Sequence, residues 1–183
     1  MNQYHSVKTI GLLLVTMLFF SCSSDLDFNQ ANDFKLEPVF IANLTSFDIP
    51  ANQFIENGVE QNISVEAQEF DVFRDSFFRK NLRRADFLFE INNTINRSYT
   101  FDIFFLDRND QALFNIHFDV PVYTGTKNEV TRKVEFKNAN LDLLKSTRRM
   151  SFVLTMKAGP VLDTSSPGSL KFTSSATAYF LIE

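Results

Sequence analysis

The side chains that could perform acid–base or nucleophilic chemistry are few, and His117 is the first to consider. The chain of 183 residues contains two His, one Cys and no Trp, and the other histidine, His5, lies in the N-terminal segment. A hydrolase of the Ser-His-Asp type would need His117 to be oriented by a carboxylate and to face a nucleophilic serine. The sequence has no Gly-x-Ser-x-Gly pattern of a nucleophile elbow. We therefore expect an exposed strand histidine and predict no catalytic residue.

Carboxylate pairs are a second source of chemistry, because two acids about 5 to 10 Å apart across a cleft can hydrolyse a glycosidic bond. Asp86, Glu90, Asp102 and Asp119 all fall opposite the apolar residues of the strands predicted below. Solvation explains acids at such positions without a catalytic role. The sequence therefore predicts a protein that is not an enzyme.

Oxygen ligands at close spacing occur at Asp107, Asn109 and Asp110 and could hold a calcium ion. The glycine and the distal glutamate of an EF-hand loop are absent, and the same residue types favour a tight reversal of the chain. One Cys and two His cannot build a cysteine-based or histidine-rich zinc site. We predict a turn here, no metal site, and no cofactor.

A basic cluster stands out because the chain as a whole carries a net charge of −4, which gives no reason to expect a nucleic acid partner. The cluster could contact anionic lipid headgroups or an acidic surface of a partner. The alternative is a solvated face neutralised by nearby aspartates. Its members are Arg74, Arg79, Lys80, Arg83 and Arg84, with Arg148 and Arg149 as a second pair, and the anionic contact is predicted at Arg79, Lys80, Arg83 and Arg84.

The N-terminus reads as an export signal. A polar stretch ends at Lys8 and is followed by an almost unbroken apolar run, Thr9 to Phe20. This run is well short of the roughly 20 residues that a transmembrane helix needs, so we expect a cleaved signal peptide over residues 1–21.

The segment after the apolar run contains the single cysteine. Leu18-Phe19-Phe20-Ser21-Cys22 resembles a bacterial lipobox, and phenylalanine at two of its positions is similar to the loose lipoboxes of Bacteroidota. The resemblance covers residues 1–28 and implies that Cys22 becomes the acylated first residue of the mature chain, with residues 22–34 as the lipidated cysteine and its tether. Several acyl chains at one site give stable anchoring. The alternative is an ordinary cleavable signal with a cysteine nearby.

The residues after Cys22 bear on the location. Ser23-Ser24-Asp25-Leu26-Asp27 resembles the short acidic signals that send some Bacteroidota lipoproteins to the outer leaflet of the outer membrane. A solvated polar tether is the alternative. We expect an outer-membrane lipoprotein, facing the periplasm or the cell surface.

The elements that position these residues are strands, because apolar and polar residues alternate with a period of two. The pattern predicts an all-β, antiparallel, immunoglobulin-like sandwich of about eight strands over residues 35–183. Short helices or crossover turns are expected at 71–85 and 138–145, and a long loop at 158–169. The predicted strands are 39–49, 63–70, 87–91, 99–106, 114–120, 130–136, 152–156 and 172–182, with turns at 57–58, 92–97 and 107–110.

Three residues make the second face of two strands apolar as well, namely Leu88, Phe104 and Leu106. Either the 71–85 segment covers them, or they form a docking surface for a protein or ligand. These three residues are therefore candidates for partner binding.

The chain as a whole resembles uncharacterised Bacteroidota (flavobacterial-type) outer-membrane lipoproteins with a single β-sandwich, which implies no catalytic residues. We predict a non-enzymatic lipoprotein that acts as an accessory or binding subunit, held by its acyl chains in the outer membrane against a β-barrel or surface protein partner. Two alternatives stay open. One is a binder of glycans or small ligands through the sandwich loops, and the other is a fimbrial-type assembly subunit that exchanges the strand 172–182 between chains.

Overall fold

The computed structural model describes residues 35–70 and 75–183, and residues 35–182 form one compact unit. The predicted signal peptide, the predicted lipidation site Cys22 and the predicted tether lie outside the described residues, as does Arg74. No helix in the described part of the chain is long and apolar enough to cross a bilayer.

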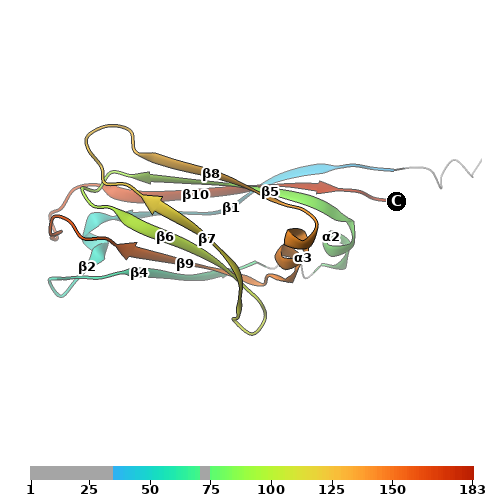
Figure 1. Ribbon diagram of the computed structural model, residues 1–183, viewed down its shortest axis with the longest axis horizontal. Helices are drawn as coiled ribbons and strands as arrows, with labels where there is room; N and C mark the ends of the chain where they lie inside the picture. The colour runs from blue at the N-terminus through green and yellow to red at the C-terminus, as the bar shows by residue number, and fades with distance from the viewer. Residues whose placement is uncertain (1–34, 71–74) are drawn as a thin grey trace, which may run out of the picture. The chain divides into compact units, whose positions relative to one another are not determined.

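Two four-stranded antiparallel sheets pack face to face (Figure 1). The first sheet has the order β1 (Val39–Pro50), β10 (Ser169–Phe180), β5 (Leu82–Asn93) and β8 (Glu129–Phe136). The second has the order β4 (Ile63–Glu69), β9 (Arg149–Met156), β6 (Tyr99–Leu106) and β7 (Ala112–Val120). A small hairpin, β2 (Ile55–Glu56) and β3 (Val59–Glu60), follows the 3-10 helix η2 (Ala51–Phe54). The predicted β-sandwich is confirmed.

The pairing of the eight long strands is nested from the ends of the domain inward. β1 pairs with β10, β4 with β9, β5 with β8, and β6 with β7. This is one long hairpin wrapped into two sheets, the arrangement of a jelly roll. The expected immunoglobulin-like topology is wrong, because in that fold the first two strands share a sheet, whereas β1 and β4 lie in different sheets. Alternation in the sequence marks a buried face but carries no information about the partner strand.

The core is built from the alternating residues that the sequence marks as apolar. In β6 the side chains of Tyr99, Phe101, Ile103 and Phe105 are fully buried. Phe172 of β10 crosses the space between the sheets, its ring centroid 4.9 Å from that of Phe101. Truncating one such phenylalanine to alanine costs about 3 to 5 kcal/mol. The predicted alternation is confirmed at 87–91 in the first sheet and in β6 and β9 of the second.

Two short helices lie at one end of the sandwich (Figure 1). In α2 (Ser76–Asn81), Asp75 accepts a hydrogen bond from Phe77 N at 2.7 Å and so caps the helix start. Phe78 of α2 packs edge-on against Phe180 with ring centroids 5.2 Å apart. In α3 (Ala139–Ser146), Leu141 and Leu144 are buried. Short helices predicted within 71–85 and 138–145 are confirmed at α2 and α3, while residues 82–85 belong to β5.

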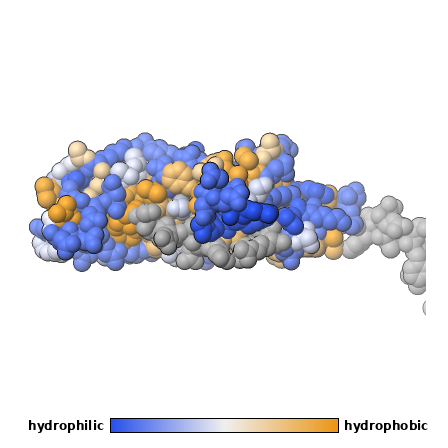
Figure 2. Space-filling model, turned by 90° about the horizontal axis from the view of Figure 1, so that it is seen from below, coloured by the Kyte–Doolittle hydropathy of each residue, from blue (hydrophilic) through white to orange (hydrophobic). Residues whose placement is uncertain are grey.

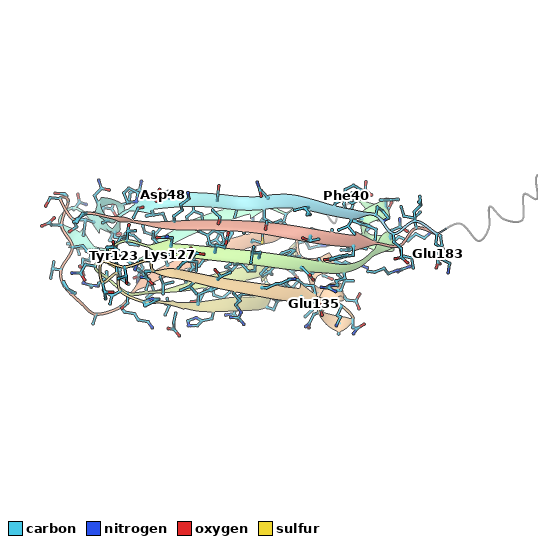
Figure 3. All side chains as sticks on the ribbon, turned by 90° about the horizontal axis from the view of Figure 1, so that it is seen from above. Phe40, Asp48, Tyr123, Lys127, Glu135 and Glu183 are labelled. Atoms are coloured by element: carbon cyan, nitrogen blue, oxygen red, sulfur yellow. The ribbon has the colours of Figure 1, made fainter. Side chains whose placement is uncertain are left out.

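The two ends of the sandwich differ in construction. We call the end with α2, α3 and the start of β1 the helix end. The opposite end, which we call the loop end, consists of the β2–β3 hairpin and the connections 94–98, 121–128 and 157–168. Figure 3 shows Phe40 toward the helix end and Tyr123 and Lys127 at the loop end.

Candidate functional site

The three predicted partner-binding residues do not form one surface. Leu88 lies on the outer face of the first sheet, opposite Ser175 and Lys133. Phe104 and Leu106 lie on the outer face of the second sheet. The prediction grouped residues of two strands that follow each other in sequence and are joined by a turn at 92–97. The turn at 92–97 instead carries the chain from one sheet to the other.

The described part of the 71–85 segment packs at the helix end. Phe77 of α2 stacks on Phe180, Phe78 packs edge-on against the same ring, and residues from Leu82 onward form β5. Residues 71–74 lie outside the described part, so the segment is placed only from Asp75. Phe104 and Leu106 are each half-buried on their own sheet.

His117 is half-exposed on β7, as expected from the sequence, with 49% of its side chain accessible. Its Nδ1 lies 2.7 Å from Asp102 Oδ1, across the β6–β7 pair. Within the described residues no hydroxyl is hydrogen-bonded to this histidine. The arrangement therefore holds two parts of a hydrolase triad on a sheet face and no third.

The 107–110 segment is a hairpin turn, which confirms that prediction. Asp107 Oδ1 accepts hydrogen bonds from Asn109 N at 2.7 Å and Gln111 N at 3.0 Å. Asp110 has a φ of 60° and forms a salt bridge with Arg149. The carboxylates are thus used by the turn and by a cation of β9.

One of the four acids expected in solvent is buried instead. Asp86 of β5 is 4% exposed because Arg84 and Lys133 lie over it, at 2.6 Å and 3.2 Å. The hydrogen bond from Arg84 is the main influence that lowers the pKa of Asp86, opposed by burial and reinforced by Lys133. Arg84 also pairs with Glu135 and stacks 4.8 Å from the Tyr179 ring.

These contacts correct the predicted basic cluster. Arg84 belongs to the outer face of the first sheet, where two carboxylates neutralise it. Arg79 of α2, in contrast, comes together with Arg148, which the sequence places in a separate pair. The sequence did not predict that they lie close together, because α2 and the start of β9 are far apart in the chain and come together only in the fold.

The helix end contains an open groove of about 480 Å³. It lies between α2, α3 and the β6–β7 turn. Four cations and two carboxylates, Asp107 and Asp142, line it. Partial burial lowers the pKa of Lys145, and nearby Arg83 lowers it further against the opposing effect of Asp142. The groove therefore has an excess of positive charge. Its cations are Arg79, Arg108, Lys145 and Arg148.

A second cavity of about 250 Å³ lies between the edge strands β7 and β8. Phe114, Val134 and Leu143 are among its lining residues. Arg132 of β8 also borders it, with its guanidinium 5.7 Å from the centre of the Phe118 ring. This cavity is about half the volume of the groove.

The loop end is organised by Arg97, which is 6% exposed. Its guanidinium donates to Lys157 O at 2.6 Å, to Pro160 O, and to Glu60 Oε2 at 2.9 Å. Glu60 Oε1 in turn accepts a hydrogen bond from Leu162 N at 2.8 Å. The ion pair of the buried Arg97 with the partly exposed Glu60 thus ties the long loop to the β2–β3 hairpin. Sequence reasoning missed Arg97, since nothing in the predicted turn 92–97 distinguishes it from an exposed arginine.

A buried asparagine joins the remaining connection to this network. Asn93 Nδ2 donates to Arg97 O and to Pro121 O, each at 2.8 Å. Three exposed valines project from the connected segments: Val59 is 63%, Val122 is 38% and Val161 is 83% exposed. The loop end is therefore a fixed scaffold with apolar side chains on its surface.

Comparison with known proteins finds no matching family model and no curated protein similar in sequence. Among solved structures, a Parabacteroides distasonis protein described as secreted is 13% identical with a TM-score of 0.44, over 64% of this chain and 36% of that one. The VP2 subviral particle of infectious bursal disease virus is 10% identical with a TM-score of 0.43, over 78% and 32%. The chain thus spans about a third of the length of both. At these identities the likeness bears on neither function nor partner.

Proposed function

We propose that this protein is an outer-membrane lipoprotein, anchored through acyl chains on Cys22, whose jelly roll is a non-enzymatic binding module. It acts as an accessory subunit that holds a membrane or surface protein. The lipobox-like segment ending at Cys22 supports the anchor. The export signal and the acidic residues that follow Cys22 support the location.

The observation that carries the binding role is the preformed loop end. Loops that are ordered before association lose little conformational freedom when a partner binds, which improves affinity. The Arg97–Glu60 pair orders the loop 157–168 in this way. Binding residues of many domains lie on loops held by a rigid scaffold.

The chemistry of the loop end favours a protein over a glycan. Its exposed apolar groups are the branched aliphatic Val59, Val122 and Val161. Stacking platforms rely on Trp and Tyr, and the chain has no Trp and four Tyr. The strand-exchange alternative receives no support from β10, which pairs on both sides within its own chain, with β1 and with β5.

The test is purification of the C-terminally tagged protein from gently solubilised native membranes, with mass spectrometry of what accompanies it. The mass of the N-terminal peptide reports acylation of Cys22. We expect a partner in fixed ratio, lost by at least about tenfold when Val59→Asp and Val161→Asp are combined. The control is Leu143→Asp, which places one aspartate at a 38% exposed residue of the helix end.

Two results would overturn the proposal. A lipoprotein that purifies alone would remove the accessory role. Equal loss of the partner in the control would show that the loop end is not the binding surface. An unmodified Cys22 would refute the anchor separately.

A further inference from the structure

The groove at the helix end gathers four cations that form no salt bridge with an acid of the described residues, although Asp107 and Asp142 also line it. Salt bridges occupy Arg84, Arg97 and Arg149. Within residues 35–70 and 75–183, none is formed by the cations of the groove or by neighbouring Arg83. Among these residues, Arg83 and Arg148 donate only to backbone carbonyls. Cations that no carboxylate pairs with are available to an anion from outside the chain. Seen from below, the molecule has a strongly hydrophilic patch near the middle of the view, with hydrophobic residues beside it (Figure 2).

Exposed apolar side chains lie at the same end. Phe40 of β1 is 56% exposed and Ile41 is 76% exposed, while Phe77 of α2 is 46% exposed. Phe40 and Phe77 both contact the ring of Phe180, which places strand and helix side by side. Cationic and aromatic groups on one surface are typical of proteins that lie on a membrane interface.

The chain enters the domain at this same end. Leu36 pairs with Ile182 through two backbone hydrogen bonds of 3.0 and 2.9 Å, and Leu181 N donates to Asn81 O, the last residue of α2. Lys35 therefore begins the domain beside the helices. Twelve residues lie between Cys22 and Lys35, and the thirteen steps from one Cα to the next span at most about 45 Å. A tether of this length permits contact with the membrane but does not itself select which end of the domain touches it.

We propose that the helix end docks on the membrane surface and that its groove binds phosphate headgroups of anionic lipids. This rests on the anchor at Cys22 but not on the protein partner proposed for the loop end. Docking selects one orientation of the tethered domain and presents the loop end away from the bilayer. Each cation brought near an anionic leaflet favours the docked state by about fivefold.

The experiment uses the acylated mature protein in vesicles, with acylation verified by mass beforehand. Because the acylated Cys22 has no free thiol, one introduced cysteine is labelled selectively. The first site is Asn109→Cys, in the turn that lines the groove, and the second is Thr126→Cys at the loop end. Quenching by a headgroup-attached quencher is compared between phosphatidylcholine vesicles with and without phosphatidylglycerol.

We expect strong quenching at the Asn109 site when phosphatidylglycerol is present and little at the Thr126 site. Arg79→Glu combined with Arg108→Glu should lower the ratio of docked to undocked domain by at least about tenfold. Lys127→Glu combined with Lys171→Glu, the same charge change away from the helix end, should leave it unaltered. Raising the salt from about 0.1 M to about 1 M, which shortens the screening length from about 10 Å to about 3 Å, should also release the domain.

Equal quenching on both kinds of vesicle, or at both label sites, would overturn the proposal. So would unchanged quenching in the Arg79 and Arg108 variant. If that variant instead loses a copurifying protein while quenching stays the same, the groove binds an acidic protein surface and not a lipid.

Discussion

The two ends of this jelly roll use charged residues in opposite ways. At the loop end the buried Arg97 donates its hydrogen bonds within the chain, to Glu60 and to two backbone carbonyls. At the helix end the arginines Arg79 and Arg108 line an open groove without an acidic partner among the described residues. A satisfied buried network fixes a single conformation, whereas exposed cations remain free to bind.

The difference extends to how firmly each end is held. The loop end contains the fully buried Phe54, whose ring is tilted against that of Tyr99 with centroids 4.9 Å apart. The helix end relies on the six-residue helix α2, whose capping residue Asp75 is exposed. Regions with few buried apolar contacts open at lower free energy than the rest of a domain. We therefore expect the helix end to open before the loop end.

Alanine substitution of one phenylalanine at each end should give the largest contrast. Phe54→Ala removes a fully buried ring and should lower the free energy of unfolding by about 4 kcal/mol. Phe78→Ala removes a half-buried ring from α2 and should cost about 1 to 2 kcal/mol. Denaturant unfolding measures both values. Equal losses would show that the two ends are packed alike.

Two glycines of the loop end allow the effect of close packing to be separated from that of backbone strain. Gly168 and Gly125 have φ of 96° and 90°, so alanine is strained at both. A Cβ at Gly168 would lie 2.3 Å from Thr94 O, whereas at Gly125 nothing lies within 4 Å. Gly125→Ala should cost about 1 kcal/mol from backbone strain, and Gly168→Ala about 2 kcal/mol more. Similar unfolding midpoints for the two variants would mean that the backbone at 94–95 can move aside at little cost in free energy.

The sequence predicted the elements of this fold better than their assembly. The alternation of Tyr99 to Leu106 predicted both the limits of β6 and its buried face, because a strand side chain's face follows from position alone. It did not predict that β5 and β6 lie in different sheets. That choice depends on contacts between distant segments, such as Val39 with Tyr179.

The candidate site was predicted only in part, because it also depends on contacts between segments that are distant in the sequence. Local composition marked Arg79 and Arg148 as unusual in an acidic chain, yet only the fold brings them to one groove. Arg97 carried no local signal, since its role comes from partners 37 and 63 residues away in sequence. Asp86 was misjudged because alternation reports which face a residue is on, and not what neighbouring side chains cover it.

The smallest effect is expected at Tyr99, within the rigid loop end. Its hydroxyl is buried and has no hydrogen-bond partner among the described residues, and burial raises its pKa well above the usual value. A buried hydroxyl without a partner loses its bonds to water and gains nothing in return. Tyr99→Phe should therefore leave the free energy of unfolding unchanged or raise it by up to about 1 kcal/mol. A clear loss of stability in chemical denaturation would show that the hydroxyl supports the Arg97 network, and the loop end would then owe its rigidity to more than the contacts of Arg97 and Asn93.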